Sequence, residues 1–225
     1  MRLAGAAQHR QTQLGSAVRP RRRRAVALAA AGADAAGALK QALRRQAGGS
    51  YGHDLPPEAR AAVEATAAAL AALTPAEAAP AEQRLAGSAW RLLYTNAVGN
   101  SSGKFGPLIA DSTQVFYGAA AEPAGATSYV NDSALGPLTL ALSGRCWPAS
   151  RERIQLQFDE LRVYLWGRRL LARPLGGMGA HWRAVYGDDD TRVFFTNKGS
   201  LFVLVRDERA GGGGGEGGEG GDGGA

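Results

Sequence analysis

The chain has 225 residues, and its hydrophobic fraction of 45% is enough for the core of one domain with accessory segments. Its formal net charge of +6 raises the question of nucleic-acid binding, but seven of the 26 Lys and Arg residues lie within the first 24 positions, where no acidic residue occurs. The other 19 basic residues are matched by 20 acidic ones. Because this body lacks a concentrated positive field, nucleic acid is not expected as a partner.

Residues 1–33 are rich in Arg and Ala and contain no acidic residue, a composition typical of organellar transit peptides. The run Arg21–Arg24 followed by the apolar run Ala25–Ala31 also fits a secretory signal, but its basic lead is unusually long for one. The apolar run is far shorter than the roughly 20 residues that a membrane-spanning helix requires. We therefore expect no transmembrane segment, and any association with lipid should be peripheral.

Residues 34–84 are dominated by Ala, Leu, Glu and Arg, which are strong helix formers. Apolar residues such as Val63 and Leu70 have spacings that fit one helical face. A glycine-rich break at 48–52 divides the segment, and Pro56-Pro57 before Glu58 stand where a second helix can start. The segment therefore predicts two short helices.

From Ser88 onward the pattern changes to period two, with Trp90, Leu92 and Tyr94 on one side of an extended strand. Eight more short strands, separated by turn residues, are expected at Gln114–Tyr117, Thr127–Val130, Leu138–Ser143, Arg153–Phe158, Arg162–Leu165, His181–Tyr186, Arg192–Thr196 and Leu201–Val205. Short strands without intervening helices predict an antiparallel barrel or sandwich over 85–207, a mainly β (α+β) fold. The sequence Asn197-Lys198-Gly199 predicts a closing hairpin.

Residues 208–225 form a Gly-rich acidic tail with too few apolar groups to offset the entropy lost on ordering. We expect it to be disordered, either as a neutral extension or as a solvating one that limits coalescence of lipid-bound particles.

Two stretches carry a resemblance to a known family. The sequence from Leu85 to Thr95, LAGSAWRLLYT, follows the helical segment, and the sequence from Gly199 to Arg206, GSLFVLVR, closes the strand region. Together they resemble the plastid lipid-associated protein (fibrillin) domain, in which a Leu-x-Gly-x-Trp-x-Leu-x-Tyr-Thr strand follows a helical lead and the last strand ends in a basic residue. This chain departs from the pattern by one extra residue between Gly87 and Trp90.

The resemblance implies a lipocalin-like antiparallel β-barrel in a chloroplast protein, located at plastoglobules, thylakoids or in the stroma. Residues 1–33 would then be a plastid transit peptide, and 85–207 the fibrillin-type barrel. The implied ligands are hydrophobic small molecules such as carotenoids, prenylquinones or lipids, and neither enzymatic activity nor a cofactor is expected. The resemblance also implies that Arg206 covers the indole of Trp90 where the first and last strands close the barrel.

A barrel of about eight strands leaves just enough interior for one small ligand. Large apolar side chains on the predicted strands are candidates for its walls, although plain core packing is the simpler explanation for each of them. These candidates are Trp90, Tyr94, Phe116, Tyr129, Leu140, Leu142, Phe158, Tyr164, Trp166, Phe194 and Phe202.

Catalytic and metal chemistry finds little support in the pattern. His53 and His181 are the only histidines after the predicted transit peptide, and neither belongs to a triad or a metal-ligand spacing. Asp188–Asp190 lacks the alternating ligands and the glycine of a calcium loop, so a solvated turn is expected there. No catalytic or metal-binding residue is therefore predicted.

Other polar or special residues are interpreted as connections or core. Ser112-Thr113 and Asp159-Glu160 are expected at strand ends, and Gly176–Gly179 as either a mobile loop at the barrel mouth or an unspecific connector. The single cysteine, Cys146, is expected to be a small core residue.

Three functions remain open at this stage. The first is binding or transport of a hydrophobic ligand, the second is a structural coat on plastid lipid globules without a defined internal ligand, and the third, more remote, is a lipocalin-like enzyme acting on a hydrophobic substrate.

Overall fold

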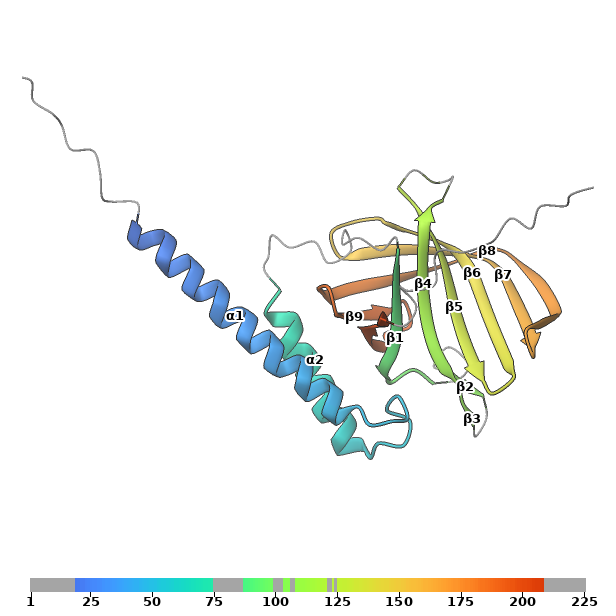
Figure 1. Ribbon diagram of the computed structural model, residues 1–225, viewed down its shortest axis with the longest axis horizontal. Coiled ribbons are helices and arrows are strands. Elements are labelled where there is room, and N and C mark those ends of the chain that lie inside the picture. Colours follow the sequence, from blue (N-terminus) through green and yellow to red (C-terminus); the bar gives the residue numbers. More distant parts are fainter. Residues whose placement is uncertain are drawn as a thin grey trace, which may run out of the picture.

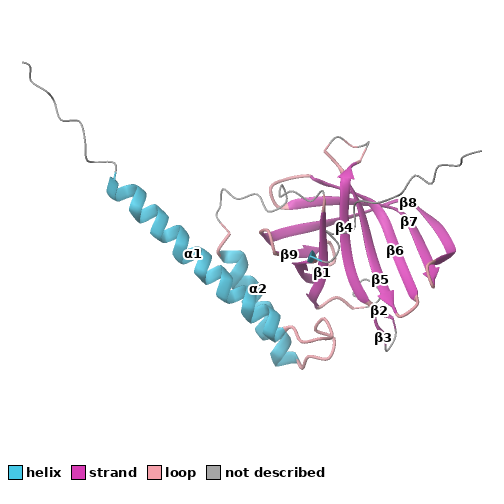
Figure 2. Ribbon diagram, in the orientation of Figure 1, coloured by secondary structure: helices cyan, strands magenta, loops and turns pink. Residues whose placement is uncertain are grey.

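The computed structural model describes residues 19–74, 87–98, 103–105, 108–120, 123 and 125–208, without the side chains of 19–30, 104 and 105. Two helices lie beside a β-barrel (Figures 1 and 2). The predictions made for residues 1–18 and for 209–225 fall outside the described residues. No helix in the described ranges is both long and apolar enough to cross a membrane.

The two helices are α1 (Arg19–Gln46) and α2 (Pro57–Ala72). Pro57 occupies the first helical position of α2, where its missing N–H costs nothing, as the sequence predicted. Helix α1 begins earlier than expected, since its backbone runs unbroken from Arg19 through the predicted boundary at Asp34. The break at 48–52 is present as the α1–α2 loop.

Eight antiparallel strands form a closed barrel in the order β1-β10-β9-β8-β7-β6-β5-β4. The barrel strands are β1 (Ser88–Thr95), β4 (Asp111–Ala119), β5 (Thr127–Leu135), β6 (Leu138–Pro148), β7 (Arg153–Leu165), β8 (Arg168–Gly187), β9 (Thr191–Thr196) and β10 (Leu201–Arg206). Two further short strands, β2 (Lys104–Phe105) and β3 (Leu108–Ile109), pair separately. The predicted fold class, an antiparallel barrel preceded by two helices, is therefore confirmed.

Closure joins the first and last barrel strands. In the β1–β10 pair Trp90 lies opposite Arg206, and on its other side β1 pairs with β4. The predicted hairpin between β9 and β10 is present, and Gly199 adopts a φ of +78° there, a conformation that favours glycine.

Strands β7 and β8 are much longer than the sequence suggested. The two segments expected as separate strands, 153–158 and 162–165, form the single strand β7, so Asp159 and Glu160 lie in mid-strand and not in a connection. The register slips between Phe158 and Glu160, which marks a β-bulge. Gly176–Gly179, expected as a loop or connector, lies within β8. Gly176 and Gly177 have positive φ values, which allow the β8 backbone to form its side of the bulge.

Two more bulges move tyrosines to the outside of the barrel. In β1, Leu92 pairs with Leu204 but Tyr94 pairs with Val203, so one extra residue interrupts the alternation. Tyr94 therefore leaves the interior face that it was expected to share with Trp90. The same happens in β8, where the register shift between Ala184 and Tyr186 carries Tyr186 outward.

Both tyrosines pack into a second core between the helices and the outer face of β8, β9, β10 and β1. This core contains Leu43, Ala47, Val63, Ala67, Leu70, Tyr94, Tyr186, Val193, Leu201 and Val203. The Tyr94 hydroxyl donates to Glu64 of α2 at 3.1 Å, and the Tyr186 hydroxyl donates to Asp188 at 2.6 Å. The bulges thus fasten the helix pair to one side of the barrel.

Ionic contacts strengthen this attachment at the β8–β9 turn. Lys40 Nζ of α1 lies 2.9 Å from Asp188 Oδ2 and 2.7 Å from Asp190 Oδ1, and Arg44 reaches Asp190 at 3.5 Å. The turn predicted at Asp188–Asp190 is present, but two of its three carboxylates bind helix α1 instead of being simply solvated.

Candidate ligand-binding cavity

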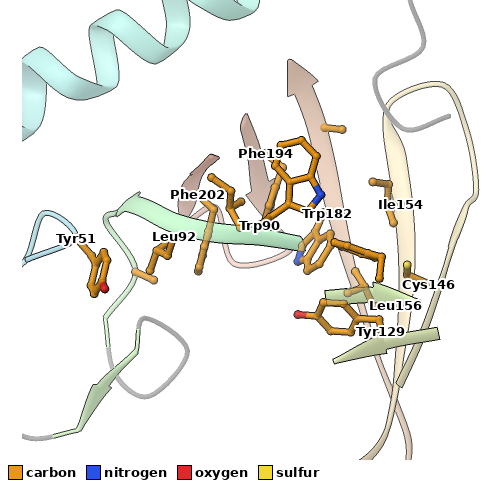
Figure 3. Close-up of a cluster of buried hydrophobic side chains, with 14 residues drawn as sticks. Tyr51, Trp90, Leu92, Tyr129, Cys146, Ile154, Leu156, Trp182, Phe194 and Phe202 are labelled. Atoms are coloured by element: carbon orange, nitrogen blue, oxygen red, sulfur yellow. The ribbon is translucent and has the colours of Figure 1, made fainter. Parts of the chain in front are cut away.

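One end of the barrel interior is filled with aromatic side chains (Figure 3). Trp90 and Phe116 are each only 1% exposed. Trp182 stacks on Phe194 with ring centroids 4.4 Å apart, and Phe194 stacks on Phe202 at 5.3 Å; these three rings belong to the same cluster and also line the cavity beyond it. Such large buried rings exclude water and make this end of the barrel a packed core.

Two guanidinium groups approach the Trp90 ring. Arg206 lies 5.7 Å from its centroid, the contact that the family resemblance implied. Arg192 lies closer, at 4.1 Å, and was not anticipated. Burial lowers the pKa of Arg192 to about 10, so this group stays charged at neutral pH. The signal for Arg192 was available in the sequence, because it stands two residues before Phe194 and strand alternation places both on one face.

Cys146 lies in the same filled end and is fully buried, as expected for a core residue. Burial raises the pKa of its thiol to about 12, which keeps the sulfur protonated and unreactive at neutral pH.

Toward the other end the interior opens into a cavity of about 260 Å³. Its walls combine apolar and aromatic side chains with a few polar groups. The lining residues are Leu92, Ser112, Gln114, Tyr129, Asn131, Leu142, Phe158, Met178, Gly179, Ala180, Trp182, Phe194, Thr196, Asn197, Lys198, Ser200, Phe202 and Leu204. Ser112, Thr196, Asn197, Lys198 and Ser200 come from strand ends and the β9–β10 turn and form a polar rim. Gln114 and Asn131 lie opposite each other within β4 and β5 and add polar groups to an otherwise apolar interior.

Seven of the predicted wall residues lie inside the barrel, in two groups. Tyr129, Leu142, Phe158, Phe194 and Phe202 line the cavity. Trp90 and Phe116 belong to the filled end.

The remaining candidates lie elsewhere. Tyr94 packs outside the barrel under the helices, and Trp166 is 77% exposed at the β7–β8 turn. Leu140 lies two residues from Leu142 and on the same face of β6. In β7 the residue opposite Leu140 is Val163, so the next residue, Tyr164, faces outward.

The sequence missed several lining residues, among them Trp182, Met178 and Leu204. Trp182 was in a predicted strand, and its bulk was a usable signal. Met178 lay in the segment interpreted as a loop, where alternation could not be applied.

The α1–α2 loop reaches the barrel beside this cavity. Tyr51 is 8% exposed and lies near Leu92 at the end of β1 (Figure 3). Its hydroxyl donates to the carboxylate of Asp111, and burial together with that carboxylate raises its pKa to about 12. A side chain at the next residue, Gly52, would collide with the Tyr94 ring, since an added Cβ would lie 2.5 Å from it. The loop is thus fixed against the barrel by close packing.

The two histidines considered for chemistry lie on different elements. His53 is in the α1–α2 loop, where its carbonyl accepts from Arg60 at 2.7 Å. His181 precedes Trp182 on β8 and lines a polar surface depression with Glu152 and Arg153. Within the described ranges of the chain, no group of three or more His, Cys, Asp or Glu side chains is arranged to hold a metal ion.

These features define a class: a closed antiparallel barrel with one packed end and a small, largely apolar cavity opening at the other, the architecture compatible with lipocalin-like ligand binding. No protein-family model matches the chain, and no curated protein matches its sequence. The relation to plastid fibrillins therefore stays a prediction from the motifs around Trp90 and Arg206.

Proposed function

We propose that the protein binds one hydrophobic or amphipathic small molecule in the barrel cavity, in the manner expected of a plastid lipid-associated protein. The observation that carries this proposal is the apolar interior volume beneath a polar rim. Burying ligand surface against Leu142, Phe158 and Phe202 would contribute about 25 cal/mol per Å² removed from water.

The size of the cavity limits what it can enclose. At about 260 Å³ it is slightly smaller than the roughly 300–1,000 Å³ typical of sites for drug-sized ligands. It therefore suits a single acyl or prenyl chain better than a whole carotenoid. A longer ligand would have to leave the mouth and continue along the strands beyond the rim.

The rim would hold the polar end of such a ligand. Ser112, near the start of β4, lies at the mouth, and its hydroxyl donates to the amide oxygen of Asn131, further along the cavity wall, at 3.4 Å. Lys198, at the exposed β9–β10 turn, adds a positive charge to the same opening. An amphipathic molecule with a carbonyl or carboxylate head matches this arrangement.

The decisive experiment fills the cavity. Ala180 lines the cavity wall opposite Leu156 in the β7–β8 pair, and Ala180→Phe would place a ring inside it. We expect this variant to bind a fluorescent fatty-acid probe about tenfold or more weakly than the parent protein, a loss of about 1.4 kcal/mol. Ala119→Phe, at an exposed position of β4, is the matched control and should bind normally.

Two results would contradict the proposal. Unchanged affinity of the Ala180→Phe variant would place any ligand outside the barrel, and failure of the parent protein to bind the probe would remove the binding function. Mass spectrometry of an organic extract of the purified protein would then identify the natural ligand.

The proposed plastid location rests on the acid-free basic start of the sequence and on the fibrillin-like motifs. It is tested by import into isolated chloroplasts, where we expect the chain to become protease-resistant and shorter. Stable full-length protein outside the organelle would contradict it.

A further inference from the structure

Two hairpins extend past the cavity mouth on one side. Beyond the cavity-lining residues Leu142 and Phe158, β6 runs back to Leu138 and β7 runs on to Leu165, where β8 begins. The backbone N–H of Trp166 donates to the carbonyl of Pro137 at 2.8 Å, so the tips of the β5–β6 and β7–β8 hairpins lie side by side. Figure 1 shows the β7–β8 hairpin on the side of the barrel away from α1 and α2.

The face of this extension that continues the cavity wall is largely apolar on β6 and β7, whereas β8 adds Arg168 and Arg173 to it, opposite Leu165 and Leu161. Leu140 pairs with Val163, which pairs with Leu171, and opposite residues in antiparallel strands share a face. Because Leu142 lines the cavity and strands alternate, Leu140 faces the same way. None of these side chains is fully buried, and Leu171 is 53% exposed. An apolar track formed by Leu140, Val163 and Leu171 therefore leads outward from the mouth, with Arg173 beside it.

A tryptophan stands at the very tip of the β7–β8 hairpin. Trp166 is 77% exposed, and it forms the two-residue turn with Gly167. Their φ values are +48° and +75°, the conformation of a type I′ turn, which favours Asn-Gly and penalises a bulky first residue. The chain thus keeps an exposed indole where the backbone disfavours it, and strain of this kind is characteristic of functional positions.

The β7–β8 hairpin also carries positive charge, with Arg168 and Arg169 next to the turn and Arg173 further back, opposite Leu161. Arg168, Arg169 and Arg173 are exposed and form no salt bridge in the part of the chain that the structure describes. Two neighbouring arginines are neutralised, because Arg145 pairs with Asp159 and Arg162 pairs with Glu160. We call the exposed set Trp166, Arg168, Arg169, Leu170, Leu171 and Arg173 the tip surface.

We propose that the tip surface docks on an anionic lipid surface and so brings the cavity mouth to it, a role that rests on the ligand binding proposed above. Tryptophan settles at the headgroup level of lipid interfaces, and arginines bind the negative headgroups around it. Leu170 and Leu171 add apolar contact with the acyl boundary. The apolar track from Leu171 to Leu142 then connects the lipid surface with the cavity.

Flotation with vesicles tests the docking. The full-length protein should float with vesicles made of equal parts phosphatidylcholine and phosphatidylglycerol, and much less with phosphatidylcholine alone. Each surface arginine contributes about fivefold to such partitioning, so replacing Arg168, Arg169 and Arg173 together by Gln should lower it on the order of 100-fold. The same replacement at the exposed residues Arg45, Arg91 and Arg153 removes equal charge elsewhere and should have far less effect.

Trp166→Asn separates docking from folding. Asn-Gly is the preferred pair for this turn, so the variant keeps or improves the hairpin while losing the indole. We expect its partitioning to fall severalfold with no loss of thermal stability. Partitioning equal to that of the parent protein, or equal losses from both arginine triples, would overturn the proposal.

A second measurement keeps this proposal distinct from the cavity function. Uptake of the soluble fluorescent fatty acid without vesicles should be unchanged in the Trp166→Asn variant and reduced in the Ala180→Phe variant. Flotation with vesicles should be reduced in the Trp166→Asn variant and unchanged in the Ala180→Phe variant. A parent protein that floats but takes up no ligand supports docking and refutes ligand binding. One that takes up ligand but never floats overturns docking alone.

Discussion

Replacing Asp188 by Asn should weaken the attachment of α1 to the barrel. The Asp188 carboxylate accepts from Lys40 Nζ at 2.9 Å and from the Tyr186 hydroxyl at 2.6 Å. It also accepts from the backbone amides of Asp190 and Thr191 at 3.1 and 2.9 Å. Asparagine retains an oxygen for these amides, so the substitution removes the charge but preserves the turn.

The magnitude follows from the pKa of Asp188. Burial alone would raise it, but the hydrogen bonds from Tyr186 and Lys40 outweigh burial and lower the pKa from 3.8 to about 2. A shift of this size corresponds to about 2.5 kcal/mol of stability. Because the side chain is still 31% exposed, solvent screening reduces the expected effect to about 1 kcal/mol. For an acid with a lowered pKa, this stabilisation is complete above the ordinary pKa and disappears as the pH falls toward the folded-state value.

Urea unfolding followed by circular dichroism over a range of pH measures this effect. At neutral pH the Asp188→Asn variant should unfold with a free energy about 1 kcal/mol lower than that of the parent protein, and the gap should narrow as the pH falls below 3.8 toward 2. Asp189→Asn is the control, since it removes the same charge from an exposed neighbour in the same turn. A gap that does not change with pH, or an equal loss in the Asp189 variant, would refute the reasoning.

Two further predictions concern the filled end of the barrel. In double-mutant cycles with Trp90→Leu, Arg192→Leu should show the larger coupling, up to about 2 kcal/mol, and Arg206→Leu about 0.5 kcal/mol, because Arg192 is closer to the ring and less solvated. Equal coupling energies for the two arginines would mean that the burial of Arg192 does not strengthen its contact with the Trp90 ring. Thiol reagents should label Cys146 in the native protein only as fast as it unfolds, whereas rapid labelling in native buffer would disprove its burial.

Most of the strands could be predicted because alternation and turn residues are local signals, whereas the closure of the first strand on the last was implied only by the family resemblance. Trp90, Phe194 and Phe202 were assigned to the interior by period two, and each faces inward. Tyr94 was assigned in the same way and lies outside, because one inserted residue reverses every later position on a strand. Such a bulge leaves no mark in a single sequence when the extra residue, here Leu93, is itself apolar.

The features that position the site depend on distant pairs. Lys40 meets Asp188 across 148 residues, and nothing near either residue indicates the other. The glycines at 176 and 177 read as a loop because their density is typical of loops, yet in β8 their positive φ values serve a bulge opposite Asp159. The cavity could not be predicted from the sequence, since alternation does not distinguish a packed interior from an open one.

The pairing of the first barrel strand with the last has a consequence for synthesis. The Thr95 hydroxyl donates to the carbonyl of Leu201, 106 residues further along the chain, so the barrel cannot close until nearly all of it has left the ribosome. Until then β1 and β9 are open edges that can pair with another chain. Closing so long a loop is entropically costly and slows folding. The nascent protein therefore passes through an aggregation-prone interval that ends only when Leu201–Arg206 adds to both edges at once.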